Sequence, residues 1–274
     1  MRTLSILPVL LLLLAGCEKE KLSNGHSDLV VVEGYLYAGR PVDSIRLSKA
    51  VTLNSTDTLF TGISDATVSI TSGGNNYNLL PSSRAGYYYY PGSDLSVSAG
   101  NTYGLNITYQ GIKVSSETTV PAVPASLQIS GTTLWVDTTL DMRQLRDSSL
   151  LVKWNNPGME YYFVILENKD TALTQITFTN PFGGDGGPVN FVRRFRTMPI
   201  QDSLYRINLF NTVAYYGHYE FKLYRVNAEY AKLYQSRSQS SINLNEPFTN
   251  IENGLGIFTA FSQYDSIFFD VKKK

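Results

Sequence analysis

The sequence is poor in the side chains that most metal and catalytic sites use. It has one cysteine and two histidines in 274 residues. A single cysteine excludes an intramolecular disulfide, a redox pair and a cysteine-cluster zinc site. The two histidines, His26 and His218, give little support to a histidine-based triad or to the usual kind of zinc site. We therefore expect no enzyme activity, no metal and no cofactor.

Charge is also scarce, and it is balanced. Charged residues make up 17% of the chain, with 23 Lys and Arg against 23 Asp and Glu. An average soluble protein has about 25% charged residues. A nucleic-acid binder normally needs a basic face that displaces counterions, so zero net charge argues against that class.

The longest apolar run is too short to cross a bilayer. Residues 4–14 are apolar except for Ser5 and Pro8, and they follow Arg2. A membrane-spanning helix needs about 20 such residues, whereas this length suits a signal peptide. The run ends in Leu14-Ala15-Gly16-Cys17, which resembles a lipobox. The sequence thus predicts a lipoprotein signal peptide over 1–16 and lipidation of Cys17; the alternative is a plain signal peptide with an incidental cysteine.

Residues 17–27 form a polar tether that begins Cys17-Glu18-Lys19-Glu20-Lys21. An acidic stretch directly after a lipidated cysteine resembles the surface-export signal of Bacteroidetes lipoproteins. By that resemblance the protein is lipid-anchored in the outer membrane and faces the medium. The alternative is that short charged tethers follow many lipoboxes without specifying export.

From residue 28 onward the body alternates apolar and polar residues with a period of two. Such alternation predicts strands that bury one face, and Gly- and Asn-rich turns separate them. The pattern therefore favours an all-β protein of two consecutive β-sandwich domains. Examples of alternating apolar residues are Ile45 and Leu47; Val68 and Ile70; Tyr103, Leu105, Ile107 and Tyr109; Leu150, Val152 and Trp154; and Tyr219, Phe221 and Leu223.

A proline-rich stretch over 121–125 is the best boundary, because proline cannot donate to a strand ladder. We expect an N-terminal sandwich over 28–120 and a C-terminal domain over 126–274. A tryptophan strand, a turn and the apolar run 161–166 give the second domain a fibronectin-III-like pattern. One helix is expected over about 228–238, with Asn227 as its cap and Tyr230, Leu233 and Tyr234 on one face.

Several segments together resemble an uncharacterised family of Bacteroidetes outer-membrane lipoproteins, a domain of unknown function. Besides the lipobox and the Val-Pro connector, they are Val32-Glu33-Gly34-Tyr35, Ser64-Asp65-Ala66-Thr67-Val68 and the closing Asn253-Gly254-Leu255-Gly256-Ile257-Phe258. Thr259 stands where that family often has glycine. Members are often encoded beside TonB-dependent receptors, so the resemblance implies such a receptor as partner. It implies no catalytic residues.

The most glycine-rich segment, residues 182–188, lacks the features of a phosphate or calcium loop. It has no Gly-Lys-Ser/Thr ending, and Asp185 is its one carboxylate. It is expected to be a hairpin loop, with contact to a partner as the alternative. Arginines follow it directly between phenylalanines. Such a cluster is commonly edge-strand charge, and its alternative is a patch for an anionic partner. The candidate contact residues are Asp185, Arg193, Arg194 and Arg196.

The tyrosine run 87–90 favours core packing, with a glycan platform as the alternative, because successive strand residues face opposite sides. Loose triplets such as Asp43-Ser44-Ile45 resemble O-glycosylation sites of Bacteroidetes proteins. The leading expectation is a non-enzymatic surface lipoprotein that acts as an accessory or binding module. The alternatives are an adhesin or glycan binder, and a hydrolase whose two carboxylates the fold would bring together.

Overall fold

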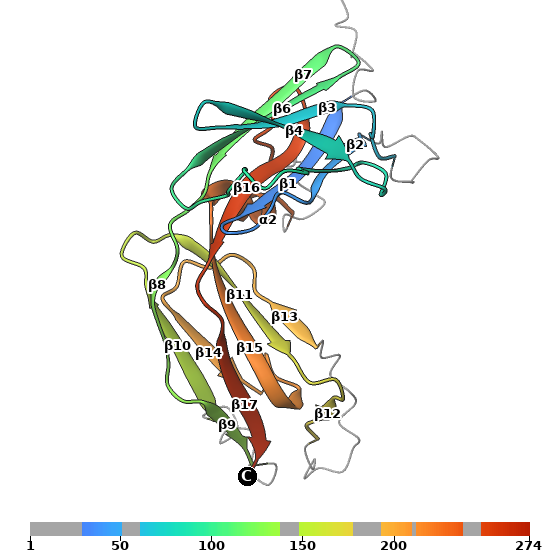
Figure 1. Ribbon diagram of the computed structural model, residues 1–274. Coiled ribbons are helices and arrows are strands. Elements are labelled where there is room, and N and C mark those ends of the chain that lie inside the picture. Colours follow the sequence, from blue (N-terminus) through green and yellow to red (C-terminus); the bar gives the residue numbers. More distant parts are fainter. Residues whose placement is uncertain (1–28, 51–60, 138–147, 178–192, 210–211, 238–247) are drawn as a thin grey trace, which may run out of the picture.

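A computed structural model describes residues 29–50, 61–137, 148–177, 193–209, 212–237 and 248–274. These residues form a mostly β structure of two lobes that meet at an angle (Figure 1). The first lobe holds β1–β7, β16 and the helix α2, and the second holds β8–β15 and β17. The described part of the chain holds no helix with the length and hydropathy needed to cross a membrane.

The strands of the first lobe are β1 (Val30–Tyr37), β2 (Ile45–Lys49), β3 (Thr67–Ser72), β4 (Asn75–Pro81), β5 (Tyr87–Tyr89), β6 (Thr102–Tyr109), β7 (Ile112–Thr119) and β16 (Leu255–Gln263). The strands of the second lobe are β8 (Ala125–Ile129), β9 (Thr133–Val136), β10 (Ser149–Asn155), β11 (Tyr161–Asn168), β12 (Thr174–Gln175), β13 (Arg194–Arg196), β14 (Leu204–Asn208), β15 (Tyr215–Val226) and β17 (Ile267–Lys273). The helix α2 spans Ala228–Arg237.

The expected alternation sets the core of each lobe. In β6 the four apolar residues of the pattern are buried, and the residues between them are more exposed. β2, β3 and β10 bury their predicted apolar residues in the same way, whereas β15 buries its predicted apolar residues and also Glu220 and Tyr224 on its other face. The apolar run 161–166 lies in β11, which is covered on both faces: Val164 packs into the second-lobe core, whereas Phe163 packs into a separate aromatic cluster.

The strand path in the first lobe begins and ends near the C-terminal strand β16. The order is β16-β1-β2-β5-β4-β3-β6-β7. A bridge between Ser115 of β7 and Glu252 joins the far end of the path to the segment before β16. The strands therefore wrap around one apolar core.

The second lobe is a sandwich of two sheets around its own core. The sheet β14-β10-β8 packs against the sheet that contains β13, β11, β15, β17 and β9. β15 also pairs with β16, so this second sheet continues into the first lobe.

The C-terminal part of the chain differs from the expected assignment of residues 126–274 to one domain. β16 pairs in parallel with β1, and Phe258 and Ala260 belong to the first-lobe core. The expected connector 121–125 does join the lobes, with Ala125 already the first residue of β8. Local alternation cannot reveal that a late strand returns, because pairing partners are chosen by tertiary contact.

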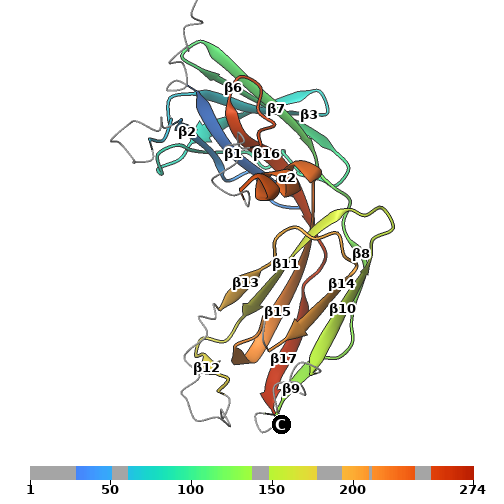
Figure 2. The same ribbon diagram turned by 180° about the vertical axis from the view of Figure 1, so that it is seen from behind.

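The helix lies close to its expected place, and the side chain of Asn227, the expected cap, bonds to the end of β7. The amide of Asn227 donates to Thr118 Oγ1 at 3.0 Å and to the carbonyl oxygen of Thr119 at 2.9 Å. The expected face is correct, since Tyr230, Leu233 and Tyr234 all pack into the aromatic cluster. The side chain of Asn227 thus ties α2 to the end of β7. Figure 2 shows α2 at the junction of the lobes.

Candidate binding site

An aromatic cluster fills the junction of the two lobes. Its rings come from β1, β11, β15, α2 and β16. Tyr37 stacks on Phe261 with ring centroids 5.0 Å apart, and Phe163 stacks on Tyr224 at 4.7 Å. Tyr230 of α2 meets Phe261 edge-on at 4.9 Å. Because rings from both lobes interlock here, the cluster holds the lobes in one relative position.

β13 places two arginines on the outward face beside this cluster. The strand pairs with β11 at the sheet edge, with Arg194 opposite Glu167 and Arg196 opposite Ile165. Phe195 between them packs against the second-lobe core, and both arginines are exposed. Phe195 thus faces the opposite side of the strand from Arg194 and Arg196, as alternation along a strand requires.

A third arginine comes from the first lobe. Arg40 follows β1 in a turn, and its guanidinium carbon lies 5.5 Å from the ring centroid of Tyr37. Tyr37 meets Tyr224 edge-on at 6.2 Å. Arg196 reaches α2, where it donates to the Tyr234 hydroxyl and lies over the Tyr234 ring at 5.6 Å. We call Arg40, Arg194 and Arg196 the junction arginines.

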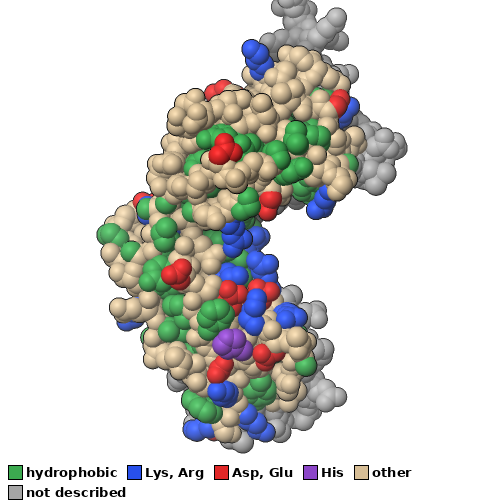
Figure 3. All heavy atoms as spheres, viewed as in Figure 1, with side chains coloured by type: hydrophobic (Ala, Val, Ile, Leu, Met, Phe, Trp, Pro, Cys, Tyr) green, Lys and Arg blue, Asp and Glu red, His purple; other side chains and the backbone are tan. Residues whose placement is uncertain are grey.

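The junction arginines share one electrostatic environment. Burial raises the pKa of Tyr37 and of Tyr224, while Arg40 and Arg194 act on both to lower it. Both hydroxyls therefore stay protonated at neutral pH. None of the junction arginines takes part in an ion pair found among the described residues. In Figure 3 Lys and Arg side chains gather at the waist between the lobes.

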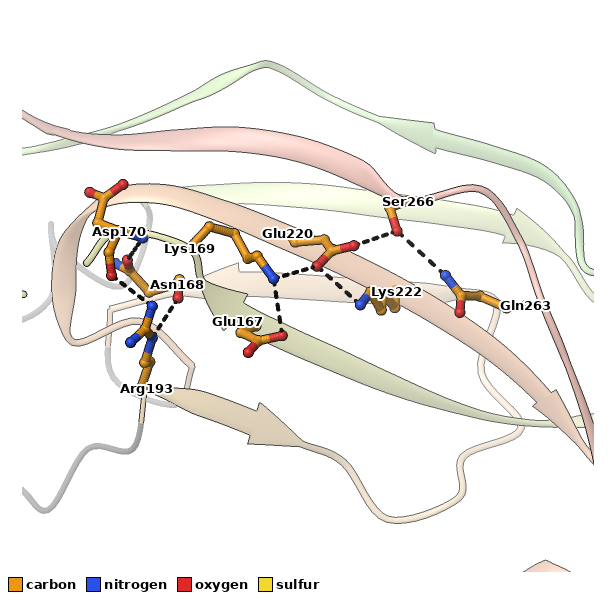
Figure 4. A network of polar contacts seen from close by, with 9 residues as sticks. All are labelled: Glu167, Asn168, Lys169, Asp170, Arg193, Glu220, Lys222, Gln263 and Ser266. Atoms are coloured by element: carbon orange, nitrogen blue, oxygen red, sulfur yellow. Dashed lines mark hydrogen bonds and ion pairs between the residues drawn. The ribbon is translucent and has the colours of Figure 1, made fainter. Parts of the chain in front are cut away.

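Arg193 makes different contacts from those of Arg194 and Arg196. It donates from Nε to the carbonyl oxygen of Asn168 at 2.9 Å and from Nη2 to that of Asp170 at 2.7 Å. Asn168 is fully buried and donates to the carbonyl oxygen of Tyr216 at 3.0 Å. Arg193 therefore closes the end of β11 and does not join the junction arginines (Figure 4).

A paired charge network occupies the same outward face of β11 and β15 (Figure 4). Glu220, only 8% exposed, lies 3.0 Å from Lys222 Nζ and 3.3 Å from Lys169 Nζ, and accepts a 2.7 Å hydrogen bond from Ser266. Burial acts to raise the pKa of Glu220, but these partners outweigh burial and hold it below its ordinary value. Glu167 pairs with Lys169 at 3.6 Å. Charges in this network are balanced, unlike those of the junction arginines.

His218 lies on this face farther from the junction. Its Nδ1 lies 2.9 Å from Asp270 Oδ1, and its ring stacks on Phe268 at 5.3 Å. The hydrogen bond from His218, helped by Lys272, lowers the pKa of Asp270. Among the described residues no serine, threonine or cysteine side chain is found hydrogen-bonded to the ring. Beside it, Trp135 and Phe268 are 54% and 48% exposed.

A shallow depression of about 410 Å³ opens where α2 begins. Glu229 accepts from Thr118 at 3.2 Å and from Thr259 at 3.3 Å within it. These polar groups satisfy one another, and they fasten α2 to β7 and β16. Thr259, where the resembling family often has glycine, thus has a structural contact.

Other candidate residues lie outside the described part of the chain. They are Cys17, His26, Asp185 and the glycine-rich loop 182–188. Within the described residues no group of three or more His, Cys, Asp or Glu side chains could hold a metal ion.

The local residue pattern predicts Arg194 and Arg196 as contact residues, but it does not predict Arg40, Tyr37 or Tyr224. The last three belong to segments far apart in the sequence, and only their approach at the junction makes them neighbours. No sequence motif marks Arg40, an exposed arginine three residues after Tyr37, as a site residue.

Comparison with known proteins gives a family and a distant structural likeness. No curated protein matches the chain. Among solved structures, a segment of two fibronectin type-III domains from chicken tenascin is similar at 10% identity, with 89% of this chain and 98% of that chain covered and a TM-score of 0.25. That score transfers no residue or contact. The model of a family described as a domain of unknown function, DUF4249, matches residues 19–267. The chain therefore belongs to the DUF4249 family.

Proposed function

We propose that the protein is a lipid-anchored module of the bacterial outer membrane that faces the medium and binds a partner without catalysing a reaction. The lipobox-like Leu14-Ala15-Gly16-Cys17 and the charged tether support the anchor and the location. The resemblance to Bacteroidetes lipoproteins encoded beside TonB-dependent receptors supports such a receptor as the partner.

The observation that carries the binding role is the exposed pair Arg194 and Arg196 on edge strand β13. They lie on the outward face at the junction, and none of the described ion pairs includes them. Arginine is favoured at protein interfaces because its planar guanidinium stacks and donates several hydrogen bonds. Two β lobes that are joined at their junction and present such groups suit recognition.

The anchor has a direct test. Cells that express the full chain are fed labelled palmitate, and the protein is then isolated. The parent chain should carry label and remain with membranes after a salt wash, whereas Cys17→Ser should carry no label and leave the membrane. Equal retention of both forms would reject the anchor and the location with it.

The partner is tested by capture of the intact lipoprotein from detergent-solubilised outer membrane. A TonB-dependent receptor should be recovered in stoichiometric amount. Capture should weaken in Arg194→Ser/Arg196→Ser and remain normal in Arg84→Ser, a control arginine that stacks over Tyr87 at 4.1 Å in the first lobe. Repeated recovery without a receptor, or equal capture by the double variant, would contradict the proposal.

The second candidate is a glycan-binding lipoprotein, and the exposed rings of Trp135 and Phe268 favour it. Both project from the outward side of paired strands β9 and β17, next to His218, Asp270 and Lys272. Flat rings beside polar groups are a suitable surface for sugars. A glycan array with the full chain in detergent should then show hits that Trp135→Ala removes and that Leu80→Ala, at a similarly exposed first-lobe site, keeps.

A further inference from the structure

We propose that the junction arginines form one binding site for an oxyanion, the carboxylate or phosphate group of a small anionic ligand, built from both lobes. The inference deepens the proposed function, because it names the chemical class that the module recognises. Arg40 comes from the first lobe, and Arg194 and Arg196 come from an edge strand of the second. No segment of the sequence contains the complete site.

The aromatic cluster positions the guanidinium groups. Arg40 lies over Tyr37, and Arg196 lies over Tyr234 while donating to its hydroxyl. A guanidinium that lies against a ring face keeps most N–H groups at its edge free to donate. Arg194 and Arg196 are two residues apart on one strand face, about 7 Å along the strand. That spacing lets the two arginines donate hydrogen bonds to separate oxygens of one ligand.

Charge complementarity points to an anion. On the neighbouring part of this face Lys169 and Lys222 are neutralised by Glu220 and Glu167. The junction arginines lack such carboxylate partners among the described ion pairs, although Glu167 stands opposite Arg194 in the strand register. Glu167 already pairs with Lys169. A positive potential therefore remains at the waist, where it favours association with anions.

Arginine suits carboxylate and phosphate groups in particular, because its fork donates two parallel hydrogen bonds to two oxygens. Tyr37 is half-buried and Tyr224 is buried beneath the arginines, so these rings act as positioning residues. The alternative role for the junction arginines is to brace the two lobes. A brace would affect stability but would bind no anion.

The experiment uses the full lipoprotein in neutral detergent and titrates it with citrate and, separately, with inorganic phosphate by calorimetry in a chloride buffer. We expect saturable binding of at least one of the two anions. Binding should weaken about ten- to a hundredfold in Arg40→Gln and in Arg194→Gln/Arg196→Gln, since each removes charged hydrogen bonds. Arg84→Gln is the matched control, because it removes an exposed arginine that also stacks on a tyrosine.

A second pair of variants separates recognition from bracing. Tyr37→Leu should weaken anion binding by removing the platform of Arg40, whereas Tyr37→Phe should retain it because the ring remains. Anion binding should also raise the unfolding temperature of the parent chain, and the same anion concentration should raise that of the Arg40→Gln variant less.

Three results would overturn the inference: no saturable binding of either anion, binding that the arginine variants leave unchanged, or equal weakening in Arg84→Gln. Receptor capture is read in parallel on the same variants. In the double variant, loss of anion binding with normal receptor capture supports this inference and contradicts the proposed receptor contact. Normal anion binding with weakened capture overturns this inference and leaves the receptor contact standing.

Discussion

At the scale of single residues, Glu220 shows how a buried charge is kept ionised. The sheet face would raise its pKa by burial, yet Ser266, Lys222 and Lys169 donate to its oxygens and lower it below its ordinary value of 4.5. Because the pKa of Glu220 is lower in the folded chain than in the unfolded chain, ionised Glu220 stabilises the fold at pH values above its pKa in the unfolded chain. The stabilisation is lost as the pH falls through the folded pKa.

Glu220→Gln should lower the free energy of unfolding by about 1–2 kcal/mol at neutral pH, because two lysines lose their shared partner. The difference from the parent chain should shrink as the pH falls below about 4. Urea unfolding across this pH range measures it. Glu167→Gln is the control, since its ion pair is longer and more exposed and should be worth no more than about 0.5 kcal/mol. A pH-independent difference would contradict the account.

At the scale of elements, the closing Gly-Leu-Gly-Ile-Phe segment has a structural explanation. It begins β16, which pairs in parallel with β1, and Val32 stands opposite Gly256. Gly256 has a φ of +106°, and a Cβ there would lie 2.0 Å from the Val32 carbonyl oxygen. Phe258 then packs across Gly34, where a Cβ would come within 2.7 Å of its ring. The glycines let β16 approach β1 closely.

Gly256→Ala should therefore destabilise the protein by about 3 kcal/mol or more, through backbone strain and the displaced strand. Gly131→Ala is the matched control: a Cβ there would meet only the end of the Leu150 side chain, at 3.3 Å. Chemical unfolding of the two variants compares them. Similar stability of both would show that β16 tolerates a side chain at this position.

The helix α2 depends on a link to β7 that its own sequence does not reveal. Asn227→Ala removes two hydrogen bonds to residues 118 and 119, so we expect a loss of about 1 kcal/mol or slightly more. In the Asn227→Ala variant, the rate of backbone amide hydrogen exchange should rise in α2 before it rises in β6. Asn76→Ala is the control, because its described side-chain bond is to the exposed Asn78. Unchanged exchange in α2 would reject the link.

At the scale of the whole molecule, the two lobes are joined by more than a linker. The described chain passes between them at residues 120–124, between β15 and α2, and between β16 and β17. β15 pairs with β16, and the aromatic cluster contains residues of both lobes. We expect the lobes to unfold together, because each would expose apolar surface without the other.

A fragment of residues 29–120 should consequently fail to fold. It lacks β16, so β1 loses a partner and the first-lobe core loses Ile251, Phe258 and Ala260. Joining the fragment to residues 248–263 through a short Gly-Ser linker should restore folding, because residue 252 pairs with Ser115 at the end of the path. Circular dichroism and amide NMR dispersion distinguish the two. An isolated fragment with native dispersion would show that β16 is dispensable.

Much of the architecture follows from the sequence by itself. Alternation with a period of two located strands in both lobes, among them β2, β3, β6, β10 and β15. The proline-rich stretch located the crossing near residue 120, and the helix was placed within a residue at each end. These features are local, since a strand or helix signal depends on neighbours in the chain. The lipid anchor, the receptor and the fibronectin-like character of the second lobe stay predictions.

Tertiary structure alone decided which strands pair and which side chains meet. β16 joins β1 because Gly254, Gly256 and Gly34 leave room for close packing, and the pattern of β16 does not name its partner. Arg40 and Arg194 both act on Tyr37 and Tyr224 only because the two lobes pack together through aromatic rings distant in sequence. Arg193, adjacent in the chain to Arg194, instead donates to the carbonyl oxygens of Asn168 and Asp170. Local periodicity encodes faces of elements, whereas the proposed site arises from contacts between elements, which the folded chain alone brings together.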